Sequence, residues 1–453
     1  MEKMNVGFAR VDITPPMGIP VAGYFIDRFA DGVLDNLEAN AVALTLGDKK
    51  VLILTLDLCG VKRVIMDEFK AAISKKTGVP VDAIFIHVTH THTGPVVNET
   101  ECPTDETKQM VKDYVKFLCS KCVDVAYLSL NDLKPAKMGY GIGQAPNIAF
   151  IRRFRMKDGS IKTNPGVGNP DIVAPIGDVD ERVNVLRFDR EGGETVVIAN
   201  FGDHPDTVGG CKISGDWPTL TRHTFEKAID NTKCIFLNGA QGDVNHVKVN
   251  PTAGDFNDMF HDFDGCSRGY GHARYMGRVV AGAIMQVYDK VNYVDVNSLD
   301  YMQKVYDMPS NMPDPKDMPL AHKYNDLHKA GRDDEIPFKA MMLTTVVAEA
   351  GRMVRLEHGP ESFPLLFSAI KIGNIALFGI PGEPFTGVGR GIKESEGYDL
   401  ILPCCLTNGS EGYYPMQDAY DEGGYEARSS NFKAGVAERI IAAGKEILAE
   451  IRK

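Results

Sequence analysis

Three of the chain's histidines fall within nine consecutive positions, in the segment HVTHTHTGP at residues 87–95. The segment follows the apolar run AIFI, so these histidines stand where a buried strand is expected to end. If the strand continues through them, His90 and His92 lie on one face and His87 on the other. Two imidazoles on one face can bind a metal ion together, or one can bind while the other transfers protons. A hydrogen-bonded polar loop is consistent with the same residues, and the HxH pattern alone leaves all three interpretations open.

Polar residues also follow three further apolar runs. The run TVVIANF leads to His204 in FGDHP, and the run NIALFGI leads to Glu383 in PGEP. The run KCIFLN leads into a glycine-rich turn that holds Asp243 and Asn245. Ligand-binding and catalytic groups concentrate beyond the carboxyl ends of strands, so these ends and residues 87–95 together predict one convergent site. Taken singly, His204 fits a core histidine equally well, and Glu383 fits a carboxylate at the start of a helix.

Two histidines and one carboxylate are a common ligand set of catalytic zinc. Zinc lowers the pKa of its bound water toward ~7 and polarises the carbonyl group that this water attacks. Hydrolysis of an amide or ester then requires a proton donor for the leaving group and a donor for the developing oxyanion. His92, Arg152 and a tyrosine are the candidates, and the sequence alone does not place them together.

Positioning these residues at one site requires several strands and helices that pack together. Short apolar runs rich in β-branched residues indicate strands at 41–46, 51–58, 83–90, 183–188, 195–201, 233–240, 366–372 and 374–380. Longer amphipathic runs indicate helices near 64–76, 105–128, 217–230, 269–289 and 430–452. Strands and helices mix along the chain, which predicts an α/β (mixed α+β) fold with a large, mainly mixed β-sheet core flanked by helices.

Residues 306–336 form the least regular stretch of the sequence, because YDMPSNMPDPKDMPLAHKYNDLHKAGRDDEI is rich in Pro, Asp, Asn and Met. Such a stretch can connect two domains or cover a site. The run at 374–380 returns to the character of a buried strand. We therefore expect one large domain over residues 1–453, with 306–336 as an insertion or lid within it.

Charge and apolar content narrow the classes of function. The formal net charge is −11, which disfavours binding to nucleic acid and stable association with anionic membranes. The chain has no apolar run of the roughly 20 residues that a membrane span needs. Its start, MEKMNVGFARVDITPP, lacks the apolar core of a signal peptide. We therefore expect a cytoplasmic protein that acts on a small molecule; its oligomeric state is not predicted by these patterns.

The cysteines do not indicate a disulfide framework, because there are nine of them, an odd number, spread over a long chain. Cys119 and Cys122 form a CxxC pair. The helical spacing of the apolar residues around that pair favours packing in a helix over metal binding or redox chemistry. The adjacent Cys404 and Cys405 have the same interpretation.

Several motifs, taken in order, resemble the catalytic domain of the neutral ceramidase family. They are GFARVDITPPMGIPVAGY, THTHTGP, NFGDHP, NGAQGDVN, IPGEPFTGVG and GYYPMQDAYDEGGYE, which together extend from about residue 6 to residue 426. The segments THTHTGP and PGEPFT are the most distinctive. The resemblance implies that the ceramidase catalytic fold covers nearly the whole chain.

The resemblance also implies a single zinc ion, Zn²⁺, with four protein ligands. In this sequence the matching positions are His90, His204, Glu383 and Tyr413. Tyrosine is an uncommon zinc ligand, so Tyr413 is proposed only because it matches the family motif. Aromatic packing in a loop is the alternative for this residue.

Further positions are assigned by the same resemblance. His92, Arg152 and Tyr425 match residues that contact or protonate the scissile amide, and Gly94 and Asn245 match substrate-binding positions. Asn245 is a departure, because ceramidases carry a serine there, so amide polarisation by that hydroxyl is not expected in this chain. An asparagine side chain can still donate a hydrogen bond.

The expected activity is hydrolysis of a linear N-acyl (amide) bond by zinc-activated water. The sequence leaves no room for the β-sandwich domain that follows in ceramidases, and it offers no means of approaching a membrane. We therefore expect a soluble N-acyl compound as the substrate. The alternatives are a true ceramidase acting on N-acylsphingosine, a metallohydrolase of an ester or phosphoester, and a non-catalytic binding homologue.

Overall fold

The structure is a computed structural model that describes residues 3–257, 260–261 and 267–453. Its largest element is a nine-stranded mixed sheet in the order β14-β12-β11-β6-β1-β3-β4-β5, with β18 paired to β6. The strands are β1 (Asn5–Asp12), β3 (Glu38–Leu46), β4 (Lys49–Leu56), β5 (Ile84–Val88), β6 (Lys134–Gln144), β11 (Arg182–Arg190), β12 (Thr195–Phe201), β14 (Thr232–Asn238) and β18 (Asn292–Val294). The pairs β12–β14 and β4–β5 are parallel, which brings the carboxyl ends of these strands to common edges.

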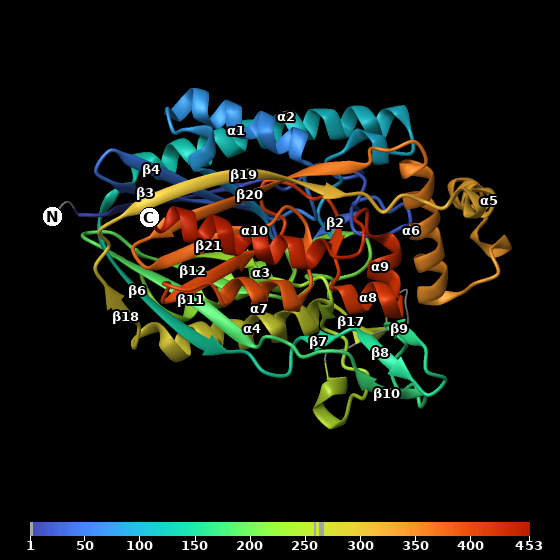
Figure 1. Cartoon of the computed structure of the whole chain (residues 1–453). Coiled ribbons are helices and arrows are strands. Elements are labelled where there is room, and N and C mark those ends of the chain that lie inside the picture. Colours follow the sequence, from blue (N-terminus) through green and yellow to red (C-terminus); the bar gives the residue numbers. More distant parts are fainter. Residues whose placement is uncertain (1–2, 258–259, 262–266) are drawn as a thin grey trace.

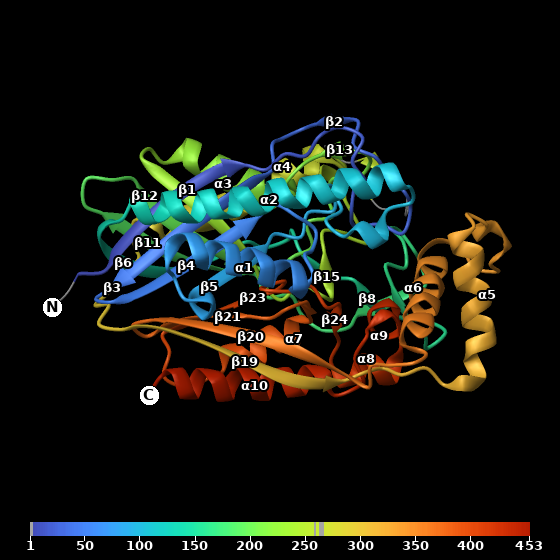
Figure 2. The same cartoon turned by 90° about the horizontal axis from the view of Figure 1, so that it is seen from above.

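A second sheet packs against the first one. It contains β19 (Leu299–Pro309), β20 (Ser362–Ile372), β21 (Ile375–Gly379) and β23 (Leu400–Cys404), in that order. Its two faces alternate along each strand, as the period of two requires. In β20, Ile370 and Ile372 belong to the core shared with the first sheet, whereas Leu365 and Phe367 belong to the core beneath α7 and α10. Figure 2 shows this sheet between the first sheet and α10.

Helices cover the outer faces of both sheets (Figure 1). α1 (Arg63–Thr77) and α2 (Asp105–Asn131) lie together, and α2 contacts β1 and β3. α3 (Asp216–Ala228) and α4 (Tyr270–Tyr288) pack on the half of the sheet that contains β14, β11 and β6. α7 (Thr386–Lys393) and α10 (Val436–Ile451) cover the second sheet. Among the described helices, none combines the length and the apolar character needed to cross a membrane.

Short elements complete the described chain. The short strands are β2 (Gly32–Val33), β7 (Phe150–Ile151), β8 (Arg153–Met156), β9 (Ile161–Thr163), β10 (Ile172–Pro175), β13 (Lys212–Ile213), β15 (Val244–Asn245), β16 (Phe260–His261), β17 (Ser267–Arg268), β22 (Glu383–Pro384) and β24 (Tyr413–Tyr414). The remaining helices are α5 (Met318–Lys329), α6 (Ala340–Leu356), α8 (Gln417–Glu422) and α9 (Tyr425–Ser429), with 3₁₀ turns at Val81–Ala83, Glu99–Glu101, Ala253–Phe256, Pro315–Asp317 and Asp333–Glu335.

The expected mixed α/β fold is confirmed, with one large mixed sheet flanked by helices. Each expected strand and helix has a counterpart, but several boundaries were wrong. The strands expected over 51–58 and 233–240 end at Leu56 and Asn238. The strand expected over 83–90 ends at Val88, before the histidine pair. The helix expected over 430–452 begins only at Val436, because Gly435 has a left-handed φ of 90° that the helix cannot include. Cys119 and Cys122 lie on α2, which supports their interpretation as packing residues.

The stretch 306–336 is more regular than the sequence indicated. β19 continues to Pro309, and α5 then packs antiparallel on α6 at the end of the molecule farthest from both termini (Figures 1 and 2). Met318 and Ala321 of α5 form a small apolar core with residues of α6. Pro319 is compatible with this helix because it stands at the first turn, where the backbone N–H groups have no partner inside the helix.

Candidate metal centre and active site

The carboxyl ends of β14 and β23 meet beside His87, which lies on β5. The backbone N–H of Asn238, at the end of β14, donates to His87 Nε2 on β5 at 2.9 Å. His87 Nδ1 faces the carbonyl oxygen of Cys405 at 2.8 Å. Burial lowers the pKa of His87 to about 3, so its imidazole is neutral. His87 is therefore a structural residue that positions the strand ends.

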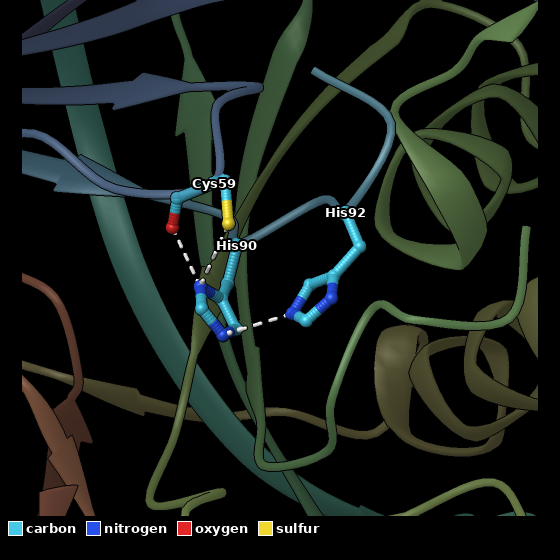
Figure 3. A group of neighbouring side chains, drawn as sticks. All are labelled: Cys59, His90 and His92. Carbon is cyan, nitrogen blue, oxygen red and sulfur yellow. Dashed lines mark hydrogen bonds between the residues drawn. The ribbon is translucent and has the colours of Figure 1, made fainter. Parts of the chain in front are cut away.

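His90 and His92 come together by a route other than the expected one. The strand has already ended, and His90 adopts a left-handed φ of 77°, which is uncommon outside glycine. Backbone hydrogen bonds hold this loop: His90 N donates to Leu58 O at 2.8 Å, and His92 N donates to Pro205 O at 3.0 Å. The two rings lie at a steep angle with 3.3 Å between their Nε2 atoms (Figure 3). The pair is thus built by a constrained loop and not by one face of a strand.

His90, His204 and Glu383 form a buried three-residue cluster. Glu383 Oε2 lies 3.3 Å from His90 Nε2 and 3.2 Å from His204 Nε2. Each imidazole presents its other nitrogen to a backbone carbonyl: His90 Nδ1 is 2.5 Å from Cys59 O, and His204 Nδ1 is 2.8 Å from Gln241 O. Carbonyl oxygens only accept, so both Nδ1 atoms carry the hydrogen and both Nε2 lone pairs face Glu383.

This arrangement fits a bound metal ion. Two imidazole Nε2 atoms and a carboxylate oxygen that face one another in a buried space are satisfied by a cation between them, which is either a proton on an imidazole or a metal ion. Ligand atoms at about 2 Å from a tetrahedral ion lie roughly 3.3 Å apart. The observed separations of 3.2 and 3.3 Å match that spacing. A carbonyl behind each imidazole is also the usual outer partner of a metal-binding histidine.

The electrostatics of Glu383 and His204 agree with this ligand set. Burial opposes the charge on Glu383, but His90 and His204 hold the pKa of its carboxyl well below the ordinary value. Burial, followed by the nearby Arg152, lowers the pKa of His204 to about 4. Glu383 and His204 therefore have the ionised carboxylate and the neutral imidazole that metal ligands require. His90 differs: burial opposes its charge, but Glu383 raises the pKa of its imidazole well above the ordinary value, so a metal ion would bind there in place of a proton.

Tyr413 and Arg152 border the cluster on the side of His204. The hydroxyl of Tyr413 lies 3.5 Å from His204 Nε2, and Arg152 Nη1 lies at the same distance, 3.5 Å, from that atom. Tyr413 reaches this place because β24 pairs in parallel with β22, which puts it directly beside Glu383. Arg152 is fixed by Glu426 Oε1 at 2.7 Å. The hydrogen-bonding groups of both side chains are thus presented to the cluster.

Tyr425 and His92 complete the ring of side chains. The ring of Tyr425 meets that of Tyr413 edge-on, with 5.6 Å between centroids. His92 Nδ1 lies 3.4 Å from Asp206 Oδ1, which also accepts a hydrogen bond from the hydroxyl of Tyr24 at 2.5 Å. His92 Nε2 therefore points toward the cluster, while its other nitrogen faces a carboxylate.

The two expected substrate-binding positions lie further away. Gly94 accepts a backbone hydrogen bond from Ala22 and lines neither of the cavities described below. Asn245 is fully buried, with its Oδ1 accepting from Val247 N at 3.0 Å and its Nδ2 donating to Asn164 Oδ1 at 2.9 Å. Asn164 does line a cavity. Asn245 is thus connected to this cavity through its hydrogen bond to Asn164, and its side-chain amide does not point toward the cluster.

Two cavities border the ring of side chains around the cluster. The loop-side cavity has a volume of about 320 Å³ and is lined by His90, Glu383 and loop residues such as Cys59. The helix-side cavity has a volume of about 310 Å³ and extends from Arg152 to α6 residues such as Leu343. The residues that line both are Gly23, Tyr24, Phe25, His92, Tyr413 and Tyr425. Cavities of this size accommodate small molecules.

Sequence reasoning missed four side chains that border the site. Cys59 follows the end of β4, so the strand-end rule applied to LDLC could have found it; its Sγ lies 3.9 Å from His90 Nδ1 (Figure 3). Asp206 stands two residues after His204 and was equally accessible to that rule. Tyr24 and Glu426 carry no local signal, because only the tertiary fold brings them to Asp206 and Arg152.

Comparisons with known proteins give the fold independent support. No protein-family model and no curated protein matches the chain. Among solved structures, neutral ceramidase from Pseudomonas aeruginosa matches with a TM-score of 0.72 at 15% identity, covering 100% of this chain and 74% of that one. A structure described as ceramidase complexed with C2 matches with a TM-score of 0.72 at 16% identity, covering 100% and 75%. The fold that the motif resemblance implied is therefore confirmed.

Proposed function

We propose that this protein is a zinc-dependent hydrolase of linear N-acyl (amide) bonds and that it acts on a soluble small molecule. The observation that carries the proposal is the buried cluster of His90, His204 and Glu383, in which two Nε2 lone pairs and a carboxylate oxygen converge. The fold shared with ceramidases supports the choice of an amide over other bonds. Phosphoesterases usually use two metal ions roughly 4 Å apart, and this ligand set suits a single ion.

In this proposal, His90, His204, Glu383 and Tyr413 hold the zinc ion. Zinc, when bound, lowers the pKa of a water molecule toward ~7 and polarises the substrate carbonyl. The Tyr413 hydroxyl is 3.5 Å from His204 Nε2, which is close enough to share an ion with it. The backbone carbonyls of Cys59 and Gln241 keep both imidazoles in the liganding tautomer.

The remaining side chains would act on the amide itself. Arg152 keeps its charge because Glu426 lies beside it, and with the Tyr425 hydroxyl it stabilises negative charge on the carbonyl oxygen. His92 Nε2 takes a proton from the attacking water and returns it to the nitrogen as the C–N bond breaks. Water oxygen thus forms the new C–O bond, and the products are a carboxylic acid and an amine.

Residues 306–336 remain our candidate for a lid. His328 and Asp333 line the helix-side cavity, and their side chains pair at 2.8 Å. α5 and α6 therefore form one wall of that cavity, where a displacement of α5 would widen its entrance.

A true ceramidase acting on N-acylsphingosine is the second candidate. It is favoured by the shared fold and by the exposure of Phe25 (44%) and Ile26 (52%) beside the cavities, where a lipid tail could rest. We favour a soluble substrate because the net charge is −11, which disfavours stable association with an anionic membrane.

Turnover by the purified, zinc-loaded protein tests the proposal. The panel contains N-octanoyl ethanolamine, N-octanoyl glucosamine, N-octanoyl glycine, long-chain ceramide in detergent, octanoyl esters and a phosphate monoester. We expect hydrolysis of soluble amides that stops with chelator and returns with zinc. Faster turnover of ceramide than of every soluble amide would favour the second candidate, and turnover of the phosphate ester alone would overturn the amide assignment.

A further inference from the structure

We infer that the substrate is bipartite: its acyl group is apolar and lies in the helix-side cavity, and its amine part is hydrophilic and lies in the loop-side cavity. This inference rests on the proposed amide hydrolysis. It adds the substrate class and the direction in which the substrate lies across the site.

The two cavities adjoin each other along a shared lining. His92, Tyr413 and Tyr425 line both of them, and His90 and Glu383 line the loop-side cavity only. A molecule that reaches from one cavity into the other over this shared lining passes the candidate catalytic residues. The bond under attack would stand at this junction, with a different part of the substrate in each cavity.

The helix-side cavity has an apolar wall. Met341, Leu343 and Val347 of α6 line it, and Ile26 lies on the facing segment. Residues 340, 343, 344 and 347 recur at the spacing of one helix face, so a continuous stripe of α6 faces the cavity. An acyl chain laid along this stripe buries apolar surface, and binding improves about fourfold for each methylene buried.

The loop-side cavity is more polar away from the cluster. Lys62, Asn98, Glu101 and Ser410 line it, alongside the small apolar Val96 and Val97. Both signs of charge are present, and amide and hydroxyl groups lie between them. A long hydrocarbon tail here would leave these groups without partners or water, whereas an amine that carries hydroxyl or carboxylate groups can bond to them.

Arg152 sets the direction of the substrate. It lines the helix-side cavity but not the loop-side cavity, so the carbonyl oxygen that it stabilises belongs on the helix side. The nitrogen then points toward the loop side, where the amine leaves. His92 lines both cavities and can reach that nitrogen.

The first experiment varies the acyl group. In zinc-loaded protein, kcat/KM is measured for acetyl, butyryl, octanoyl and dodecanoyl ethanolamine, with Met341→Trp as the blocked variant. Its matched control is Met342→Trp, the same change at the adjacent residue, whose side chain is 41% exposed and does not line the cavity. Ratios between substrates of one variant are compared, so losses of folded or metal-loaded protein cancel.

We expect the octanoyl-to-acetyl ratio to fall at least tenfold in Met341→Trp and to change less than twofold in Met342→Trp. An unchanged ratio in both variants would overturn the placement of the acyl group. If Met341→Trp does not fold, the same octanoyl-to-acetyl ratio is measured for Thr344→Phe, which also lines the cavity from α6.

The second experiment varies the amine at constant octanoyl group, comparing glucosamine, ethanolamine and hexylamine as leaving amines. Wild-type protein should prefer the hydrophilic amines by at least tenfold, and Lys62→Leu should reduce that preference while Lys75→Leu, elsewhere on α1, should not. Preference for hexylamine, or a Lys62→Leu effect on the acyl ratio instead, would overturn the inference. Absence of turnover with every amide would overturn the proposed hydrolase itself, so the two failures are distinguishable.

Discussion

Replacing His92 with alanine should abolish most activity and leave the metal in place. The change removes an imidazole whose Nε2 lies 3.3 Å from His90 Nε2 but leaves the backbone hydrogen bond from His92 N to Pro205 O. The loop that carries His90 should therefore keep its shape. Loss of a general acid–base group lowers kcat by about 100-fold or more, equivalent to about 2.7 kcal/mol of transition-state stabilisation.

The assay for this prediction combines kcat for N-octanoyl ethanolamine with elemental analysis of the same sample. Full zinc with a large loss of kcat is the expected result. His358→Ala, a change at an exposed histidine, serves as the control and should behave as wild type. Parallel loss of zinc and activity in His92→Ala would refute this reasoning, because it would make His92 a ligand.

Three further predictions concern buried carboxylates that face cationic or imidazole side chains. Asp206→Asn should lower kcat about 10- to 100-fold at unchanged zinc content, since the carboxylate behind His92 orients its ring; kcat equal to wild type would exclude that role. Glu426→Gln should cost about 3 kcal/mol of unfolding free energy in urea, because it leaves the buried Arg152 without its carboxylate, whereas Glu394→Gln in an exposed pair should cost little. Glu38 has its pKa lowered from 4.5 to about 2: burial opposes the shift, but His223, Arg222 and Arg10 outweigh it. The free energy of unfolding of the wild type should exceed that of Glu38→Gln by about 3 kcal/mol above pH 4.5, and this difference should disappear as the pH falls through 2. A difference in unfolding free energy that does not change with pH would contradict this prediction.

Much of the convergent site was predictable because it follows one local rule. β-Branched apolar runs define the strands, and polar residues directly after their ends are brought together by parallel pairing. His90, His204 and Glu383 obey this rule, and the structure brings them together. The rule depends on local sequence alone, so it needs no knowledge of the tertiary fold.

Other features depend on long-range pairing and had no local signal. Tyr413 stands beside Glu383 only because β24 pairs with β22, and the sequence offered it solely through a family motif. The strand ends at Val88 and His90 then adopts a left-handed φ, neither of which periodicity can detect. α5 was missed because a proline such as Pro319 usually indicates a break in a helix, although a proline is tolerated in the first turn.

The zinc content of the purified protein tests the central claim most directly. After dialysis against a low concentration of zinc, the wild type and the control Glu394→Ala should each retain one zinc ion per chain. His90→Ala, His204→Ala and Glu383→Ala should each retain far less, because each removes one of the three converging ligand atoms. A wild type that holds no zinc, or full zinc in all three variants, would contradict the claim that this cluster is a metal centre.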